Sequence, residues 1–336
     1  MASLALGGIR PEGPLRIASF AVADDLRGAV IELTGAVTAT ALDSGWSATG
    51  RRVEVPLAFN GGERQQLVLR IIRGGVSIGD VTIEYYPREL YAALGVESGG
   101  TIQLVTALPY ARPAATPTAV QPHEAMAVDH RGWAMARDQL GLPTDGSVAD
   151  SLRALYATFA RLDEGATTAE ICPAGSSLAT VRRMVGGACR AWCSGYARVT
   201  SGYLRSVEVP TSVIHLDGSL GSLANGVRVQ SSEAHQTVEW WDGGGWRWTD
   251  PTFRLLEARI GDGPRLSLAE ALEALADPAL RSELVFTRLD AESGVWRTAP
   301  YGAQDPAFND ALARYLTGDK RLIVVDEADE VRRAGG

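Results

Sequence analysis

The chain has 336 residues, of which 46% are hydrophobic and 21% are charged, a composition typical of a globular protein with material for two cores. Its net charge of −8 argues against a broad phosphate-binding surface, so we expect no nucleic-acid partner. Residues 1–24 lack a basic start followed by an unbroken apolar run, and no stretch approaches the length of a membrane span. We therefore expect a cytoplasmic protein with no membrane partner.

The first hundred residues carry short runs rich in Val, Ile and Leu, separated by turn residues. Such runs predict β-strands, here over residues 15–21, 29–33, 52–59, 66–72 and 81–86. Several short strands at this spacing are typical of a β-sandwich, either immunoglobulin-like or jelly-roll. We therefore expect an N-terminal β-sandwich.

Segment 107–122 is rich in Pro, Ala and Thr, which indicates a linker or a crossing loop. We place the domain boundary there, with the β-sandwich domain over residues 1–120 and a second domain over residues 121–336.

The second half has helical periodicity over residues 124–140 and 148–162, and again after Cys193. Ser267 and Glu270 form a capping-box pattern that predicts a helix through residue 276. A later helix is expected over residues 305–316, a short strand over 322–325, and a loose charged tail beyond 326. The fold class expected for the whole chain is α+β.

Cys193 stands at the predicted start of a helix that follows Gly186 and Gly187 and stops before Pro210. Aromatic and aliphatic residues recur after it at helical spacing, which predicts one buried face. A cysteine at a helix N-terminus feels the positive end of the helix dipole, which favours the thiolate, the nucleophilic form of the side chain.

His235 and Asp250 flank a predicted hairpin whose turn contains Asp242-Gly243. With a two-residue loop, His235 and Asp250 fall directly opposite each other, although another loop length would shift this register. A carboxylate beside a histidine fixes its tautomer and stabilises the imidazolium, which in turn can hold a cysteine as thiolate. The sequence alone does not bring Cys193 to this pair.

Over residues 152–253 the chain resembles the transglutaminase-like superfamily, which shares a papain-like core. The resemblance depends on motifs in the family's order, namely Cys193, Tyr196-Ala197, Arg205, Val209-Pro210, His235, Glu239, Trp246 and Asp250-Pro251-Thr252. The chain departs from the pattern where Glu208 replaces a Gly, Ala234 replaces another Gly, and Thr237 replaces an aromatic residue.

The resemblance implies a papain-like catalytic domain in which Cys193 is the nucleophile, His235 the general acid/base, and Asp250 the residue that orients the imidazole. It implies attack on an amide or ester carbonyl to give a thioester, which water or an amine then resolves. The leading hypothesis is hydrolysis or acyl transfer at an amide of a peptide or protein substrate. Calcium serves some family members, but no calcium loop pattern is visible here, and we expect no cofactor.

Three further residues are candidates for the substrate cleft: Trp192, Glu239 and Trp241. Glu239 shares a strand face with His235, but a salt bridge at the rim is an equal alternative. Tryptophans of such strands more often fill a core than line a cleft.

The chain has three cysteines, an odd and small number that does not predict a disulfide framework. Cys172 and Cys189 are therefore expected to be packed thiols. Together with Cys193 and His235 they could instead ligate zinc, but structural zinc sites usually show tighter paired spacing, so we expect no metal.

Two other functions stay open. The chain could be a binding or scaffold protein in which the sandwich holds a protein or glycan partner and the triad is a relic. It could also be a glycan-directed amidase, akin to the peptide:N-glycanases of the same superfamily.

Overall fold

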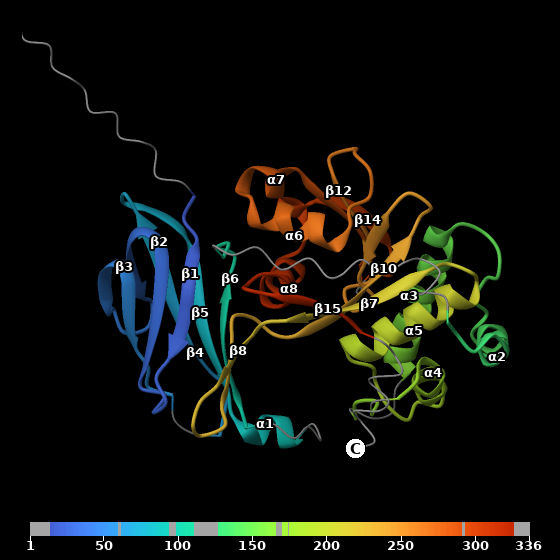
Figure 1. Ribbon diagram of the computed structural model, residues 1–336, viewed down its shortest axis with the longest axis horizontal. Helices are drawn as coiled ribbons and strands as arrows, with labels where there is room; N and C mark the ends of the chain where they lie inside the picture. Colours follow the sequence, from blue (N-terminus) through green and yellow to red (C-terminus); the bar gives the residue numbers. More distant parts are fainter. Residues whose placement is uncertain are drawn as a thin grey trace, which may run out of the picture.

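The computed structural model describes residues 14–59, 62–93, 99–110, 127–165, 170–173, 175–290 and 293–325. Much of the expected linker 107–122, the first residues of the helix expected over 124–140, and the charged tail lie outside these ranges. A sheet-rich N-terminal part and a mixed helical and sheet part lie side by side, so the α+β class is confirmed (Figure 1).

The N-terminal part is an eight-stranded sheet in the order β1-β2-β4-β5-β6-β9-β8, with β3 paired to β2. Its strands are β1 (Ile17–Val22), β2 (Gly28–Ala41), β3 (Ser47–Pro56), β4 (Gln65–Arg73), β5 (Val76–Tyr86), β6 (Thr101–Thr106), β8 (Ser219–Ser222) and β9 (Arg228–Gln230), with α1 (Arg88–Ala93) after β5. All five strands expected from the sequence are present, although their bounds differ: β2, β4 and β5 extend beyond the expected ranges, β1 is shifted by one or two residues, and β3 begins earlier and ends earlier.

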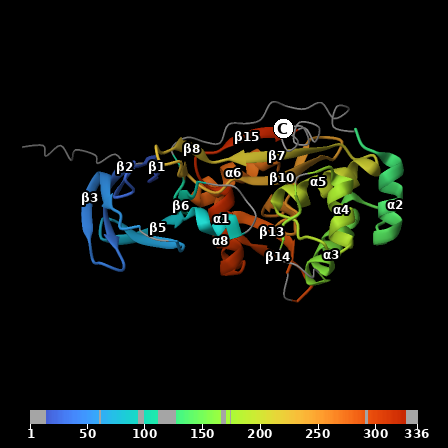
Figure 2. The same cartoon turned by 90° about the horizontal axis from the view of Figure 1, so that it is seen from below.

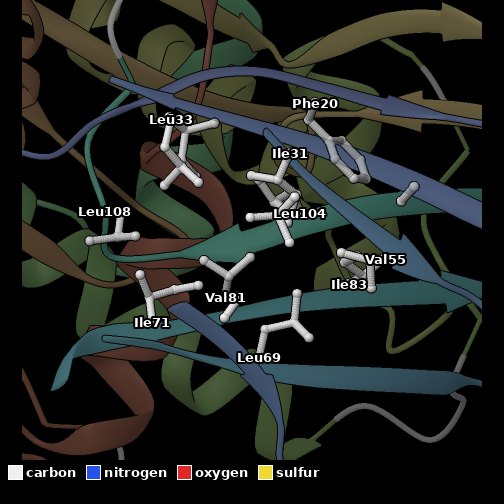
Figure 3. Close-up of a cluster of buried hydrophobic side chains, with 14 of the residues drawn as sticks. Phe20, Ile31, Leu33, Val55, Leu69, Ile71, Val81, Ile83, Leu104 and Leu108 are labelled. Carbon is white, nitrogen blue, oxygen red and sulfur yellow. The ribbon is translucent and has the colours of Figure 1, made fainter. Parts of the chain in front are cut away.

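Alternation along β2 shows why these residues form strands, because nearly every second side chain is buried. The buried side chains of the sheet, among them Ile31, Leu69, Ile83 and Leu104, meet in one core (Figure 3). A bridge between Ile17 and Tyr110 joins β1 to the segment after β6, so the hydrogen-bonded strands curve around this core. A sandwich of two separate sheets is therefore not confirmed.

The hairpin β8-β9 comes from the second half of the chain but pairs with β6, and β9 runs parallel to it. The boundary near residue 120 thus remains a prediction, since this hairpin reaches back across it to complete the N-terminal sheet.

The second part is built around α5 (Cys193–Ser206), which packs against β10 and β7 on one side and α2, α3 and α4 on the other (Figure 2). The surrounding helices are α2 (His130–Leu140), α3 (Val148–Gly165) and α4 (Ser177–Val185). The sequence predicts one buried face for this helix, but eleven of its fourteen residues are buried. Gly202 allows α5 to approach α2 closely, because a Cβ at this position would lie 2.7 Å from the Trp133 ring of α2.

Two further sheets complete this part. One is four-stranded in the order β11-β10-β7-β15, and the other is three-stranded in the order β12-β13-β14. The elements are β7 (Thr211–Asp217), β10 (His235–Trp241), β11 (Trp246–Thr249), β12 (Leu255–Ile260), α6 (Leu268–Ala276), α7 (Pro278–Glu283), β13 (Leu284–Leu289), β14 (Trp296–Pro300), the short 3-10 helix η2 (Tyr301–Ala303), α8 (Pro306–Leu316) and β15 (Arg321–Val325). The predicted capping box of Ser267 and Glu270 is present at α6.

Glu84 of β5 joins the two parts of the molecule. Its buried carboxylate accepts hydrogen bonds from Arg314 of α8, from Arg64 at 2.7 Å and from the Tyr86 hydroxyl at 2.7 Å. Burial alone would raise the pKa of Glu84, but the hydrogen bonds from Arg314, Tyr86 and Arg64 lower it to about 2. Glu84 is therefore ionised at neutral pH and holds α8 against the N-terminal sheet.

We expect Glu84→Gln to lower the free energy of unfolding by about 3 kcal/mol at neutral pH, because Arg314 loses its buried partner. The wild-type pKa lies below that of an unfolded glutamate, so the contribution is present above about pH 4.5 and is lost as the pH falls toward 2. Urea denaturation at neutral and acidic pH measures this difference. Glu54→Gln, which removes an exposed partner of Arg52, is the control and should have a much smaller effect. Equal losses in the two variants would contradict the assignment.

Glu208 has a φ of 66°, a left-handed conformation in which glycine carries no steric cost. It stands where the related motif has glycine, just after α5. We expect Glu208→Gly to raise the free energy of unfolding by about 1 kcal/mol, measured by chemical denaturation. Glu208→Ala keeps the Cβ and should show no such gain; a gain of equal size in the alanine variant would rule out backbone strain as the cause.

Candidate active site

Cys193 is the first residue of α5, as the sequence predicts. The preceding segment is held in place by backbone hydrogen bonds between residues 170–172 and Arg190, each 2.8 Å long. Cys172 and Cys189 are joined by a disulfide, with their Cα atoms 4.9 Å apart. The expectation that they are packed thiols is therefore wrong, and Cys193 is the one free thiol among the three cysteines, all of which are described.

The disulfide also removes the zinc alternative, because two of its four ligands are bonded to each other. Within the described ranges, no group of three or more His, Cys, Asp or Glu side chains could hold a metal ion. The same ranges contain no helix long and apolar enough to cross a membrane. Disulfides persist mainly in oxidising compartments, so this bond weighs against the cytoplasmic location, which stays a prediction.

His235 is the first residue of β10, and Asp250 follows the last residue of β11. The hairpin register differs from the expected one. Trp241 pairs with Trp246, so the loop has four residues rather than two, because the Asp242 side chain accepts hydrogen bonds from the N–H groups of Gly244 and Gly245. The change moves the pairing by two positions, which keeps His235 and Asp250 on the same face as diagonal neighbours.

His235 Nε2 lies 2.7 Å from Asp250 Oδ2, and both side chains are buried, with 1% and 0% of their surface exposed. The other carboxylate oxygen, Asp250 Oδ1, accepts the N–H groups of Thr252 at 3.0 Å and Phe253 at 3.3 Å. The Asp-Pro-Thr turn thus uses its own backbone to fix the carboxylate. Asp250 therefore holds the imidazole by Nε2 and leaves Nδ1 to face another group.

The His235 ring is also held on its faces. Its centroid lies 5.1 Å from the ring of Phe253 and 5.3 Å from that of Tyr315 in α8. Nδ1 has no hydrogen-bond partner among the described residues, and the Cys193 thiol lies close enough to the imidazole to raise its pKa. The three residues that the sequence singled out are therefore together in one site.

Burial would raise the pKa of the Cys193 thiol, but the hydrogen bond and charge of His235 and the backbone N–H of Gln236 lower it below its ordinary value. Burial would lower the pKa of His235, but the charge and hydrogen bond of Asp250, with smaller contributions from Cys193, raise it to about 9. The two shifts favour a thiolate–imidazolium pair at neutral pH.

Asp163, at the end of α3, connects the helix of Cys193 to the turn of Asp250. It accepts the Tyr196 hydroxyl at 2.5 Å and Arg254 Nη2 at 2.5 Å. Arg205, near the other end of α5, donates to the carbonyl of Thr211 at 2.9 Å and so ties the helix to β7. Tyr196 and Arg205 of the sequence motif thus fix the helix relative to the turn of Asp250 and to β7.

The three cleft candidates are distributed differently. Trp192 precedes Cys193 and is 40% exposed, so it can meet a substrate at the site. Glu239 instead accepts the Leu268 N–H at 2.7 Å beneath α6 and is buried. Trp241 contacts Trp246 at the hairpin end, about 20 Å along β10 from His235 at the usual strand rise. Only Trp192 is close to the triad.

Tyr315 and Phe253 were missed by the sequence reasoning. Tyr315 comes from α8, more than a hundred residues after Cys193, and no local pattern links it to the site. Phe253 directly follows the Asp-Pro-Thr motif, so its position could have been noticed.

Comparisons with known proteins find only partial or weak similarity to this chain. No family model matches the chain. A protein-glutamine gamma-glutamyltransferase of Pseudomonas aeruginosa is 34% identical over 92 residues, which cover 26% of this chain and 14% of that protein. A solved structure of a candidate cysteine protease from Cytophaga hutchinsonii shares 10% identity, with a TM-score of 0.27 over 71% of this chain and 67% of that one. The sequence match supports a likeness to a transglutaminase over about a quarter of the chain.

We expect Cys193 to react quickly with iodoacetamide at about pH 7, because its pKa is lowered and the thiolate persists until the pH falls through that pKa. His235→Ala should slow alkylation at least about tenfold at that pH, since burial then raises the pKa of Cys193 with no imidazolium to lower it. Mass spectrometry of the native, non-reduced protein measures the rate, and labelling after reduction and denaturation, where the cysteines should react alike, is the control. Equal native rates in the two proteins would favour a relic triad.

Proposed function

We propose that the chain is a transglutaminase-like cysteine enzyme that attacks an amide carbonyl and hydrolyses or transfers the acyl group. The observation that carries the proposal is the buried hydrogen bond between His235 and Asp250 beside the Cys193 thiol. A buried imidazolium with a raised pKa has little structural use, whereas it is what a cysteine nucleophile requires.

In the first step, the Cys193 thiolate forms a bond to the carbonyl carbon. The carbon–nitrogen bond then breaks, and the leaving nitrogen takes a proton from the His235 imidazolium, which leaves a thioester on Cys193. The backbone N–H of Cys193, one of the unpaired donors at the start of α5, is a candidate to stabilise the negative oxygen.

In the second step, neutral His235 takes a proton from the incoming nucleophile, and the thioester bond breaks to restore the thiolate–imidazolium pair. Water gives a carboxylic acid, and an amine gives a new amide. Asp250 keeps the imidazole in the tautomer that both steps need.

The substrate we favour is the side-chain amide of a glutamine in a peptide or protein, because the matched segment comes from a protein-glutamine gamma-glutamyltransferase. A glycan-directed amidase remains the alternative. A protein or glycan partner on the N-terminal sheet also remains a prediction.

The proposal is tested with a glutamine-containing peptide, with and without a primary amine. We expect ammonia release together with deamidated or amine-linked peptide, identified by mass spectrometry. Cys193→Ala and Asp250→Asn should each reduce the rate at least about a thousandfold, whereas Glu239→Gln, which lies outside the triad, should retain most activity. Turnover that survives Cys193→Ala would exclude the mechanism.

A further inference from the structure

Lys320 is the single lysine of the chain, because the other 31 of its 32 Lys and Arg residues are arginines. It follows α8 and directly precedes β15. Its side chain is among the largest fully buried ones, with 1% of its surface exposed. Burying an ammonium costs free energy unless neighbouring groups compensate for its charge. The groups around Lys320 therefore indicate its role.

The Lys320 ammonium donates a hydrogen bond to the backbone carbonyl of Glu233, two residues before His235. The residue before Lys320 is hydrogen-bonded to the same loop, since the Asp319 N–H donates to Ser231 Oγ at 3.1 Å. The segment from Tyr315 to Lys320 therefore touches the site twice: the Tyr315 ring packs on the imidazole, and Lys320 supports the backbone that leads into it.

The charges that face Lys320 come from three elements. Glu233 lies in the loop before β10, Asp217 ends β7, and Cys193 begins α5. Burial lowers the pKa of Lys320 to about 7, and the charges of Glu233, Asp217 and Cys193 partly oppose that shift. Cys193 itself faces His235, Asp250 and Tyr315 as well. Lys320 is thus a second cation whose charge interacts with that of Cys193.

Lysine suits this enclosed position because its ammonium is a compact point charge, whereas a planar guanidinium needs room for five donors. The other 31 Lys and Arg residues of the chain are all arginine, so the exception coincides with the site of the proposed chemistry.

We propose that Lys320 is a positioning residue of this active site, whose buried ammonium stabilises negative charge on Cys193 and fixes the backbone before His235. The proposal rests on the function proposed above, since it assigns Lys320 to the same thiolate. If the buried charge serves function, it lowers the stability of the fold. Removing the charge should therefore lower the reactivity of Cys193 and raise the stability of the protein.

The test compares Lys320→Met, which keeps the length of the side chain without its charge, with Lys320→Arg, which keeps a charge. Arg321→Met is the matched control, because it removes the adjacent cation, whose side chain is 68% exposed and paired with Asp217. Two quantities are measured for each protein: the pH at which native Cys193 loses half its maximal alkylation rate, and the midpoint of thermal denaturation at about pH 7.

Lys320→Met should move the alkylation midpoint up by about one pH unit, which slows alkylation about tenfold on the acid side. Its denaturation midpoint should rise, because a buried charge has been replaced by an apolar side chain. Lys320→Arg should keep the alkylation midpoint near that of the wild type, and Arg321→Met should leave it unchanged.

An alkylation midpoint in Lys320→Met that matches the Arg321→Met control would overturn the proposal. A lower denaturation midpoint together with slower alkylation would also overturn it, since Lys320 would then be needed only for folding. The wild-type profile reports separately on the proposed function. If wild-type Cys193 has an ordinary thiol pKa, that function fails, while the difference between the variants still measures the effect of Lys320.

Discussion

The hydrogen bond between His235 and Asp250 is the interaction on which the rest of the site depends. It requires a hairpin to present two side chains on one face, a tight turn to saturate the second carboxylate oxygen, and aromatic rings to hold the imidazole. Because Asp250 engages Nε2, Nδ1 is available to the Cys193 thiol. The positive end of the α5 dipole lies at Cys193 and also favours the thiolate. A buried ion pair of this kind contributes little to stability by itself. We therefore infer that the hairpin, the turn and the aromatic rings hold it in position for catalysis.

The N-terminal sheet takes part in that support. Glu84 binds Arg314, the next residue along α8 is Tyr315, and the turn after the helix carries Lys320. The hairpin β8-β9 adds a second connection, since it leaves β7 next to the site and pairs with β6 (Figure 1). The two parts therefore share elements, and a change in the N-terminal sheet can reach the imidazole through α8. This gives the N-terminal part a structural role that does not require a ligand of its own.

The sequence was informative where the pattern is local. The start of α5, the capping box at Ser267 and the alternating strands all follow from neighbouring residues, and their positions agree with the structure. The hairpin register was missed because the Asp242 side chain stabilises a longer loop, yet the error was an even number of residues, so the face was unchanged. The disulfide, the β6-β9 pairing and the burial of Lys320 depend on contacts between distant segments, which no local pattern reports. The triad could be proposed from motifs, but the surrounding Tyr315 could not.

The most direct test of the central claim is the ionisation state of His235, followed by NMR titration of its imidazole in the wild type and in Cys193→Ser. The account predicts an imidazolium that persists at neutral pH and loses its proton near pH 9, with a lower pKa once the thiolate is replaced by a hydroxyl. A His235 that is neutral at pH 7 in the wild type, or that titrates identically in the serine variant, would contradict the ion pair and with it the proposed nucleophile.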